Sequence, residues 1–399
     1  MNKLLNLSVL AATLLLSSCG NVEREEPLAE VIDRGLKVST EQALLMAKNL
    51  EQEDGRLPKT IKDGKLETSD CYWWCSGFFP GELWYLYENN PSPELKKYAE
   101  LFTKRLEKVQ YVTDNHDVGF MLYCSYGNGY RLTKNPDYKK VLVTGANSLS
   151  TRYRSAVKAI RSWEFNKAKW QYPVIIDNMM NLELLTWTGK TTGEDRFAQI
   201  AIDHANTTMA NHFRPDYSCY HVVSYDTITG IPHVKQTHQG YADESAWARG
   251  QSWALYGYTM MARETGIPEY LAQAKHIAHF LMNHSNMPAD KIPYWDFDSP
   301  DIPNTPRDAS AAAIMASALI ELSQLDQSQE AKNYLDFAEQ QIRSLSSPEY
   351  LAEKGTNCNF VLKHSTGHLP GNSEVDVPLS YADYYYVEAL MRLKNLIRR

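Results

Sequence analysis

The sequence predicts an all-α fold, an (α/α)6 toroid in a single domain, from two features of the chain. Helical periodicity of apolar residues extends through most of it, whereas period-two alternation is confined to short pieces such as 220–225. Segments that are apolar nearly all round, such as 174–185 and 309–322, alternate with amphipathic ones such as 93–110 and 328–347. This alternation predicts an inner ring of buried helices covered by an outer ring of half-exposed helices.

The expected helices follow one another with short connections, which favours antiparallel pairs of neighbours. Pro93 and Pro268 mark the first turns of two of them. The longer irregular stretches 214–243, 285–306 and 348–380 are expected over the open end of the ring, where loops carry chemistry. Helices are expected at residues 39–52, 77–90, 93–110, 116–126, 138–163, 175–188, 194–212, 244–265, 268–284, 307–325, 328–347 and 381–397.

The first residues have the pattern of an exported lipoprotein. Lys3 precedes an apolar run over residues 4–16, and two serines then precede Cys19. This pattern predicts a signal peptide over residues 1–19 with a lipobox that ends at Cys19, the residue to be lipidated. The alternative is a simple cleaved signal in which Cys19 is incidental, because lipobox matches are short. Both interpretations predict export, to the periplasmic side of the envelope or to the outer membrane.

The rest of the chain is expected to form one body. Residues 20–36 are polar and acid-rich, which predicts a tether, and residues 37–399 contain no Pro/Gly/Ser-rich linker, which predicts one catalytic domain. The net charge is −7 and no dense Lys/Arg block is present, which argues against nucleic acid as a partner. We expect a monomer or weak dimer that meets the membrane only through its lipid anchor. The 25 tyrosines and 9 tryptophans suit sugar binding as well as a core.

The cysteines do not form the disulfide framework of a small scaffold. Apart from Cys19 there are five, an odd number spread over a large chain. Cys71 and Cys75 are close enough in sequence to bridge in an oxidising compartment. Buried free thiols are the favoured interpretation, since a large core needs no covalent staple.

Two aspartates lie in surroundings that favour acid–base chemistry. Asp177 is flanked by valine, isoleucine and methionine in the stretch 172–185, and Asp117 lies in the stretch 115–130. A carboxyl among apolar side chains is desolvated, which raises its pKa and allows it to donate a proton near neutral pH. The alternative interpretation is that Asp177 caps a helix and Asp117 forms a turn, which are common roles of aspartate.

A second group of residues suits the recognition of a carboxylate. Arg249 and Trp253 are four residues apart and share one helix face. A guanidinium beside an indole can hold a carboxylate beside a stacked sugar ring, although the same pair also occurs as a buried cation–π contact. Trp74 and Phe78 have the same spacing, and such an aromatic stripe is more often core than sugar platform.

Other chemistries have weaker signals. His364 and His368 have i, i+4 spacing, but the intervening Ser-Thr-Gly argues against the helix that would align them as metal ligands. The chain has no Gly-rich phosphate loop before a helix and no nucleophilic serine elbow. The residues themselves therefore give only a weak signal for a metal site.

Several long motifs resemble the unsaturated glucuronyl hydrolases of glycoside hydrolase family 88. The motifs occur in the family's order, and the resemblance covers essentially the whole chain after the expected tether. The stretches are W-C-S-G-F-F-P-G-E-L-W-Y-L-Y-E, H-D-V-G-F-M-L-Y-C-S-Y-G-N-G-Y, I-I-D-N-M-M-N-L-E-L-L, H-Q-G-Y-A-D-E-S-A-W-A-R-G-Q-S-W and P-Y-W-D-F-D-S-P-D-I-P-N-T-P-R-D-A-S. The resemblance implies the same (α/α)6 barrel that the helix pattern predicts.

Carried over residue by residue, the resemblance implies that Asp177 is the catalytic acid/base and Asp117 the second essential carboxylate. Ser380 and Tyr384 are candidate contacts from the C-terminal segment. The remaining positions, which the resemblance places around the unsaturated uronate, are Trp74, Phe78, His116, Trp163, His221, Gln239, Arg249 and Trp253.

The resemblance also implies the reaction. The substrates are unsaturated uronic-acid oligosaccharides that polysaccharide lyases release, and the enzyme hydrates their C4–C5 double bond. The resemblance implies that this reaction requires neither a metal nor an organic cofactor. The sugar beyond the cleaved linkage and its sulfation stay open. Cys75 stands where a Thr-like residue is expected, and Lys235, Lys291 or Lys363 is a candidate sulfate contact, although a lone loop lysine is more often only solvated.

Two alternatives to this function stay open. An unsaturated rhamnogalacturonyl hydrolase would use similar chemistry on pectin fragments, although the H-D-V-G-F and S-A-W-A-R-G-Q-S-W stretches favour the glucuronyl family. A non-catalytic glycan-binding lipoprotein would use the same aromatic residues but would not need two carboxyls in one site. Turnover of an unsaturated disaccharide separates these possibilities.

Overall fold

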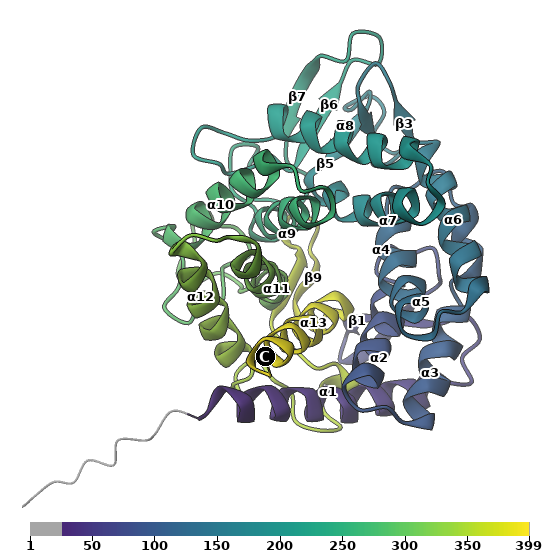
Figure 1. The fold of residues 1–399 in the computed structure, drawn as a ribbon. Coiled ribbons are helices and arrows are strands. Elements are labelled where there is room, and N and C mark those ends of the chain that lie inside the picture. Colours follow the sequence, from purple (N-terminus) through teal and green to yellow (C-terminus); the bar gives the residue numbers. More distant parts are fainter. Residues whose placement is uncertain (1–25, 399) are drawn as a thin grey trace, which may run out of the picture.

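The computed structural model describes residues 26–398 and has the expected (α/α)6 architecture (Figure 1). Within this part of the chain, no helix is long and apolar enough to cross a membrane. The inner ring contains α2 (Phe78–Asn89), α4 (Val118–Leu122), α5 (Asn128–Thr133), α7 (Leu182–Thr192), α9 (Ala248–Thr265), α11 (Ala309–Leu325) and α13 (Ser380–Ile397). The outer ring contains α1 (Leu28–Leu50), α3 (Pro93–Lys104), α6 (Pro136–Ser150), α8 (Asp195–Asn211), α10 (Pro268–Asn283) and α12 (Glu330–Leu345).

The burial of the helices follows the expected alternation. Helices α9 and α11 are buried on nearly all sides, whereas α3 and α12 bury a single stripe. Each outer helix from α3 to α12 packs on the inner helix that precedes it in the chain. The proline starts are also observed, since Ser92 caps α3 before Pro93 and the Pro268 residue opens α10.

Helix α1 closes the ring, which corrects the expected tether. It starts at Leu28, packs on α13 and α2, and buries Val31, Ile32 and Leu36. Residues 28–36 therefore belong to the folded domain, because the helix that they begin lies against α13 (Figure 1) and its apolar side chains are buried. The expected signal peptide, the lipobox at Cys19 and the start of the tether lie outside the described residues.

Two expected helices are shorter than their periodicity indicated. The segment 138–163 is helical only as far as Ser150, and β3 (Tyr153–Arg154) and β4 (Ala159–Ile160) then form a small hairpin. The segment 175–188 begins with the end of β5 (Pro173–Ile175) and a 3-10 turn, η3 (Ile176–Asn181), before α7 starts. Strands β4 and β5 are buried and consist of apolar residues, and periodicity alone does not distinguish such short apolar runs from a helix.

A short strand was expected at 220–225, and the structure has several hairpins beside the helices. Strand β6 (Val222–Tyr225) lies there, between β5 and β7 (Pro232–Gln236), and β8 (Ser365–His368) pairs with β9 (Ser373–Val377). A further hairpin joins β1 (Leu57–Lys62) to β2 (Lys65–Ser69) through Asp63 and Gly64, which both have positive φ. An Asp-Gly pair between two strands is the local signal of such a turn. Short helical turns complete the chain at η1 (Glu107–Tyr111), η2 (Tyr123–Gly127), η4 (Asn357–Asn359) and η5 (Leu369–Gly371).

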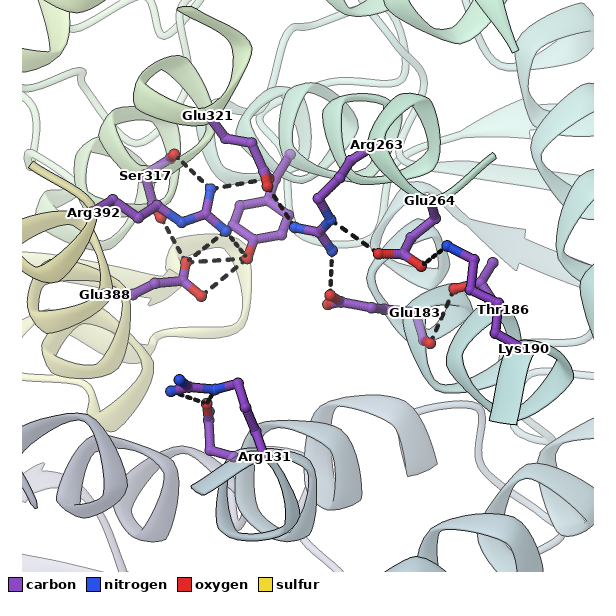
Figure 2. A network of polar contacts seen from close by, with 12 residues as sticks. Arg131, Glu183, Thr186, Lys190, Arg263, Glu264, Ser317, Glu321, Glu388 and Arg392 are labelled. Carbon is purple, nitrogen blue, oxygen red and sulfur yellow. Dashed lines mark hydrogen bonds and ion pairs between the residues drawn. The ribbon is translucent and has the colours of Figure 1, made fainter. Parts of the chain in front are cut away.

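A network of ion pairs ties inner helices together (Figure 2). Arg263 of α9 lies between Glu183 of α7 and Glu321 of α11, and it also pairs with its neighbour Glu264. Arg392 of α13 binds the same Glu321 and continues the network to Glu388 and Tyr256. The network thus joins four inner helices at one end of the barrel.

Candidate active site

The predicted site residues gather around a cavity at the opposite end of the inner helices. Arg249 begins α9 and lines this cavity, whereas Arg263 of the ion-pair network lies fourteen residues further along the same helix. At 1.5 Å per residue, these two positions are about 21 Å apart along the helix axis. The cavity has a volume of about 840 Å³, which is within the range of pockets that enclose small ligands.

Asp177 lies in the wall of this cavity, in the 3-10 turn between β5 and α7. It is 7% exposed, and its Oδ2 atom has no hydrogen-bond partner. Burial raises the pKa of Asp177 to about 7 against the opposing charge of Arg249, and the nearby Asp117 carboxyl adds to the rise. The alternative role as a helix cap is wrong, because the Asp177 side chain caps neither η3 nor α7.

His221 lies behind Asp177 and is completely enclosed. Its Nδ1 atom accepts hydrogen bonds from the backbone N–H groups of His238 and Gln239, which assigns the proton of the neutral ring to Nε2. This Nε2 atom lies 3.7 Å from Oδ2 of Asp177 and has no partner. Burial holds the pKa of His221 well below its usual range, so a neutral N–H faces the carboxyl. His221 therefore contributes to the site from beneath the cavity surface.

Asp117 is the second carboxyl of the cavity and lies just before α4. Burial raises its pKa to about 7, although Asn181 and Arg152 oppose the rise. The neighbouring His116 places Nε2 at 3.3 Å from Oδ1 of Asp117, and burial lowers the pKa of His116 to about 3. The side chain that forms the turn here is Asn115, whose Oδ1 atom accepts a hydrogen bond from the backbone N–H of Asp117, whereas Asp117 does not cap α4 with its own side chain. The cavity thus holds two carboxyls that titrate near neutral pH and a neutral imidazole.

Arg249 lines the cavity but is held more tightly than its motif indicated. Its guanidinium donates to Asp308, at 3.1 Å, and to the backbone carbonyls of Thr366 and Gly367. Its Nε atom is buried without a partner. The guanidinium lies over the ring of Trp247, at 4.5 Å, and not over Trp253. Arg249 therefore provides a fixed positive charge at the floor of the cavity.

Aromatic side chains form the walls. Trp74 and Trp163 line the cavity as expected, and Trp163 stacks on Phe165 with ring centroids 4.6 Å apart. Phe78 and Trp253 do not line it. Both are fully buried behind the wall, where Phe78 packs edge-on against Trp74 and Trp253 acts on the site by lowering the pKa of Asp177.

The C-terminal segment contributes residues that the sequence did not identify. Gln239 lines the cavity as expected and donates to the carbonyl of Gly367 in the hairpin of β8 and β9. The same hairpin brings His368 and Glu374 into the cavity wall, and α13 contributes Tyr381. The candidates Ser380 and Tyr384 lie elsewhere, since Ser380 is buried and Tyr384 lines a separate cavity beside the ion-pair network.

Metal ligands and disulfides are absent from the described part of the chain. No group of three or more histidine, cysteine, aspartate or glutamate side chains in residues 26–398 is arranged to hold a metal ion. His364 pairs with Asp376, whereas His368 faces the cavity, so the two histidines do not converge. Cys71 and Cys75 are buried free thiols. These facts agree with the favoured interpretation of the cysteines.

The exposed rings at the mouth of the cavity mark a path for a longer ligand. Tyr72, Trp73, Tyr111 and Phe165 all line the cavity, and each is at least 40% exposed. Large aromatic side chains that gather at one opening suit the apolar faces of sugar rings. The site can therefore bind a sugar chain that extends beyond the two carboxyls.

Comparison with known proteins places this site in a family. The model described as Glycosyl Hydrolase Family 88 matches residues 49–394. An unsaturated glucuronyl hydrolase from Formosa agariphila is 51% identical over 327 residues, which are 81% of this chain and 80% of that protein. The unsaturated glucuronyl hydrolase of Bacillus sp. GL1 is 33% identical over 361 residues, or 88% of this chain and 94% of that protein.

Solved structures agree with these relatives. The crystal structure of an unsaturated glucuronyl hydrolase specific for heparin aligns with a TM-score of 0.88 at 49% identity, and covers 92% of this chain and 98% of its own. The Bacillus sp. GL1 structure aligns with a TM-score of 0.84 at 30% identity, with 91% and 97% of the two chains covered. The (α/α)6 prediction is confirmed, and the chain belongs to glycosyl hydrolase family 88.

Proposed function

We propose that this enzyme removes a 4,5-unsaturated glucuronic acid from the non-reducing end of glycosaminoglycan fragments produced by polysaccharide lyases. The observation that carries the proposal is the buried Asp177 carboxyl, whose Oδ2 atom has no partner in a cavity that also holds Asp117 and Arg249. A carboxyl with a pKa of about 7 is still protonated in a large fraction of molecules at neutral pH. It is therefore able to act as a general acid there.

The chemistry is hydration of a vinyl ether. The C4–C5 double bond of the substrate is conjugated to the ring oxygen, so a proton from Asp177 adds to C4 and leaves an oxocarbenium-like centre at C5. Water adds to C5 and gives its proton to the Asp177 carboxylate, which restores the acid. The resulting hemiketal opens and releases a 5-keto-4-deoxyuronate and the neighbouring sugar. One carboxyl serves both steps because its protonation state changes between them.

The other groups bind and orient the sugar. Asp117 holds sugar hydroxyls, and its nearby charge favours the protonated form of Asp177. The fixed charge of Arg249 attracts the uronate carboxylate, and the indole of Trp163 offers a face for stacking. This division of roles differs from a retaining glycosidase, in which the second carboxyl attacks the sugar as a nucleophile.

The names of the relatives support glycosaminoglycan fragments as substrates. One related structure is described as specific for heparin, and relatives in Streptococcus pyogenes and Streptococcus pneumoniae are named unsaturated chondroitin disaccharide hydrolases. Heparin and chondroitin fragments present the same unsaturated uronate to the site, and they differ in the sugar beyond the cleaved linkage. A panel of unsaturated disaccharides that differ in linkage and sulfate position, with a pectin-derived fragment included, identifies the preferred substrate.

The test of the mechanism follows the double bond and the added proton. Wild-type enzyme in heavy water places deuterium at C4 of the released keto sugar, because protonation there precedes release. In the Asp177→Asn variant the ultraviolet absorbance of the double bond persists while binding remains, because an amide donates no proton to carbon. If the folded variant consumes the double bond at near wild-type rate, Asp177 is not the acid. An unlabelled C4 indicates direct attack at the anomeric carbon instead.

We further propose that the enzyme is exported as a lipoprotein anchored through Cys19. The supporting pattern is the apolar run over residues 4–16, followed by Ser17, Ser18 and Cys19. Expressed in a bacterial host with its own leader, the full chain is expected in the membrane fraction. The Cys19→Ala variant is expected to lose lipid labelling, and a wild-type chain found only in the cytosol contradicts export.

A further inference from the structure

A second, smaller cavity lies next to the catalytic one and is lined by arginine side chains. Its volume is about 230 Å³, and it shares Thr113 and Glu164 with the wall of the catalytic cavity. Arg152, Arg154 and Arg161 line it, from the end of α6 and the hairpin of β3 and β4. The unexpected strands in place of a long helix thus create a basic pocket beside the site.

The three guanidinium groups are held to different degrees. Arg152 is buried and fixed, because it donates to the backbone carbonyls of Arg161 and Thr113 and pairs with Glu164. Arg161 pairs with Glu164 at 3.1 Å, and its own Nε atom is buried without a partner. Arg154 is exposed and donates through Nε to the carbonyl of Thr227. Arg161 and Arg154 therefore retain donor capacity toward the pocket.

The charges around the pocket do not balance. Among the described residues that line it, Glu164 is the one acid beside three arginines. This carboxylate is shared by Arg152, Arg161 and Lys167. Burial lowers the pKa of Arg152, and the charge of Arg161 acts in the same direction. An added anion would offset this excess of positive charge.

The pocket is also electrostatically close to the catalytic groups. The charge of Arg152 lowers the pKa of both His116 and Asp117 in the neighbouring cavity. Trp163, a wall of that cavity, directly precedes Glu164 in the chain and stacks on the exposed Phe165. Because Thr113 and Glu164 line both cavities, a sugar chain that leaves the catalytic cavity beside Trp163 comes next to the arginine pocket.

We propose that the arginine pocket is a subsite for an anionic substituent on the sugar chain beyond the cleaved linkage. The inference rests on the proposed function, because it assigns a substrate preference to the same enzyme. The shared chemistry of the ligand is an oxyanion, carried either by a sulfate ester or by the carboxylate of a further uronate. Paired guanidinium groups recognise such oxyanions through charge-assisted hydrogen bonds.

The experiment compares neutral and anionic aglycones in the double variant Arg154→Gln/Arg161→Gln. Arg152 is left in place because its guanidinium holds two backbone carbonyls. The substrates are unsulfated unsaturated disaccharides, the same disaccharides sulfated at each position in turn, and an unsulfated tetrasaccharide with an internal uronate. These arms distinguish a sulfate from a carboxylate ligand.

For the preferred anionic substrate, the double variant is expected to raise KM by about tenfold or more with kcat within twofold, since two charge-assisted contacts are lost. The unsulfated disaccharide is expected to keep its wild-type kinetics. The matched control is Lys158→Gln, which removes a cation from the same hairpin but outside the pocket. The subsite would be overturned if the double variant lost equal efficiency on neutral and anionic substrates, or lost none on any substrate. It would also be overturned if Lys158→Gln showed the same loss.

A binding measurement keeps this inference separate from the proposed function. If the wild-type enzyme turns over no unsaturated uronide, the proposed function fails, and sodium sulfate then probes the pocket directly. At matched ionic strength with sodium chloride, sulfate is expected to raise the melting temperature of wild type and Lys158→Gln more than that of the double variant. Sulfate also stabilises proteins in general, and this effect is the same in all three proteins. The difference between their melting-temperature shifts therefore reports binding in the pocket. Equal shifts in all three proteins exclude the anion site.

Discussion

The burial of Asp177 favours acid chemistry but lowers the stability of the folded protein. Its carboxyl has a pKa of about 7 in the folded protein, against 3.8 without burial. Between these values the folded state binds more protons than the unfolded state, so the free energy of unfolding falls as pH rises from about 4 to 7. Above pH 7 the buried carboxylate is charged, and the activity that depends on its proton is expected to fall as well.

The Asp177→Asn variant is therefore expected to be more stable than wild type at pH 8 and similar to it at pH 4. The expected gain at pH 8 is on the order of 2 kcal/mol, because the amide has no charge to bury. Chemical denaturation at the two pH values measures it. The control is Asp301→Asn, a substitution of an exposed aspartate, which should leave the free energy of unfolding unchanged at both pH 4 and pH 8. A gain of equal size at both pH values would contradict the raised pKa.

The guanidinium of Arg249 connects substrate recognition to the hairpin of β8 and β9. Arg249→Lys keeps the charge but loses the planar fork that donates to Asp308, Thr366 and Gly367. We expect kcat/KM to fall by one to two orders of magnitude, about 1–3 kcal/mol. Steady-state kinetics and a melting curve measure the effect. A variant with wild-type kinetics and stability would remove Arg249 from the site.

At the level of elements, the inner helices hold the site at one end and an ion network at the other. The network gathers Arg263 and Arg392 with glutamates from α7, α11 and α13 (Figure 2). Removal of one partner leaves charges with little solvent around them, which costs more than the pair itself contributes. The catalytic cavity lies about 21 Å away along α9, so stability and activity can be affected separately.

Arg263→Met is expected to lower the free energy of unfolding by about 2–4 kcal/mol, because Glu183 and Glu321 lose their shared partner. The expected loss of unfolding free energy is smaller than for a fully buried ion pair, since the Arg263 side chain is 29% exposed. Denaturant titration measures the loss, and KM is expected to stay at the wild-type value. Arg196→Met, which breaks an exposed pair with Glu194, should cost less than about 1 kcal/mol. If both variants lowered the free energy of unfolding by a similar amount, the network around Arg263 would stabilise the protein no more than an exposed ion pair does.

Some elements were predictable from local chemistry and others were not. The Ser92-Pro93 start of α3 and the glycine end of α9 at Gly266 are local signals, and both are observed. The Asp63-Gly64 turn was an equally local signal for the first hairpin and was missed. The buried strands β4 and β5 had no such signal, because their apolar residues fit a helix or a buried strand equally well.

At the scale of the whole molecule, the ring closes when the first described helix packs on the last. α1 covers α13 and completes the outer layer, so residues 28–36, which were expected to belong to a tether, are part of the barrel (Figure 1). The hairpins and loops between helices then gather over the N-terminal ends of α9, α11 and α13. Catalysis needs this complete ring, since its carboxyls and charges come from segments far apart in the chain.

The proposed chemistry needs a proton donor and a water molecule. A carboxyl group is able to donate the proton and then to accept a proton from the water. Turnover of an unsaturated disaccharide is therefore expected to survive dialysis against a strong chelator. The measurement compares the rate before dialysis, after dialysis and after the addition of a divalent ion. Activity that is lost and then restored by the ion would move the mechanism toward metal-assisted hydrolysis.

The sequence by itself determined the all-α class, the alternation of inner and outer helices and the motifs that contain both carboxyls, because periodicity and short motifs are local properties of the chain. Only the tertiary structure decided which side of each motif faces the cavity. Trp74 lines it and Phe78 does not, and Arg249 lines it while Trp253 is covered. Spacing fixes which residues share a helix face but not where that face or its terminus points, and this direction follows from the packing of the complete ring.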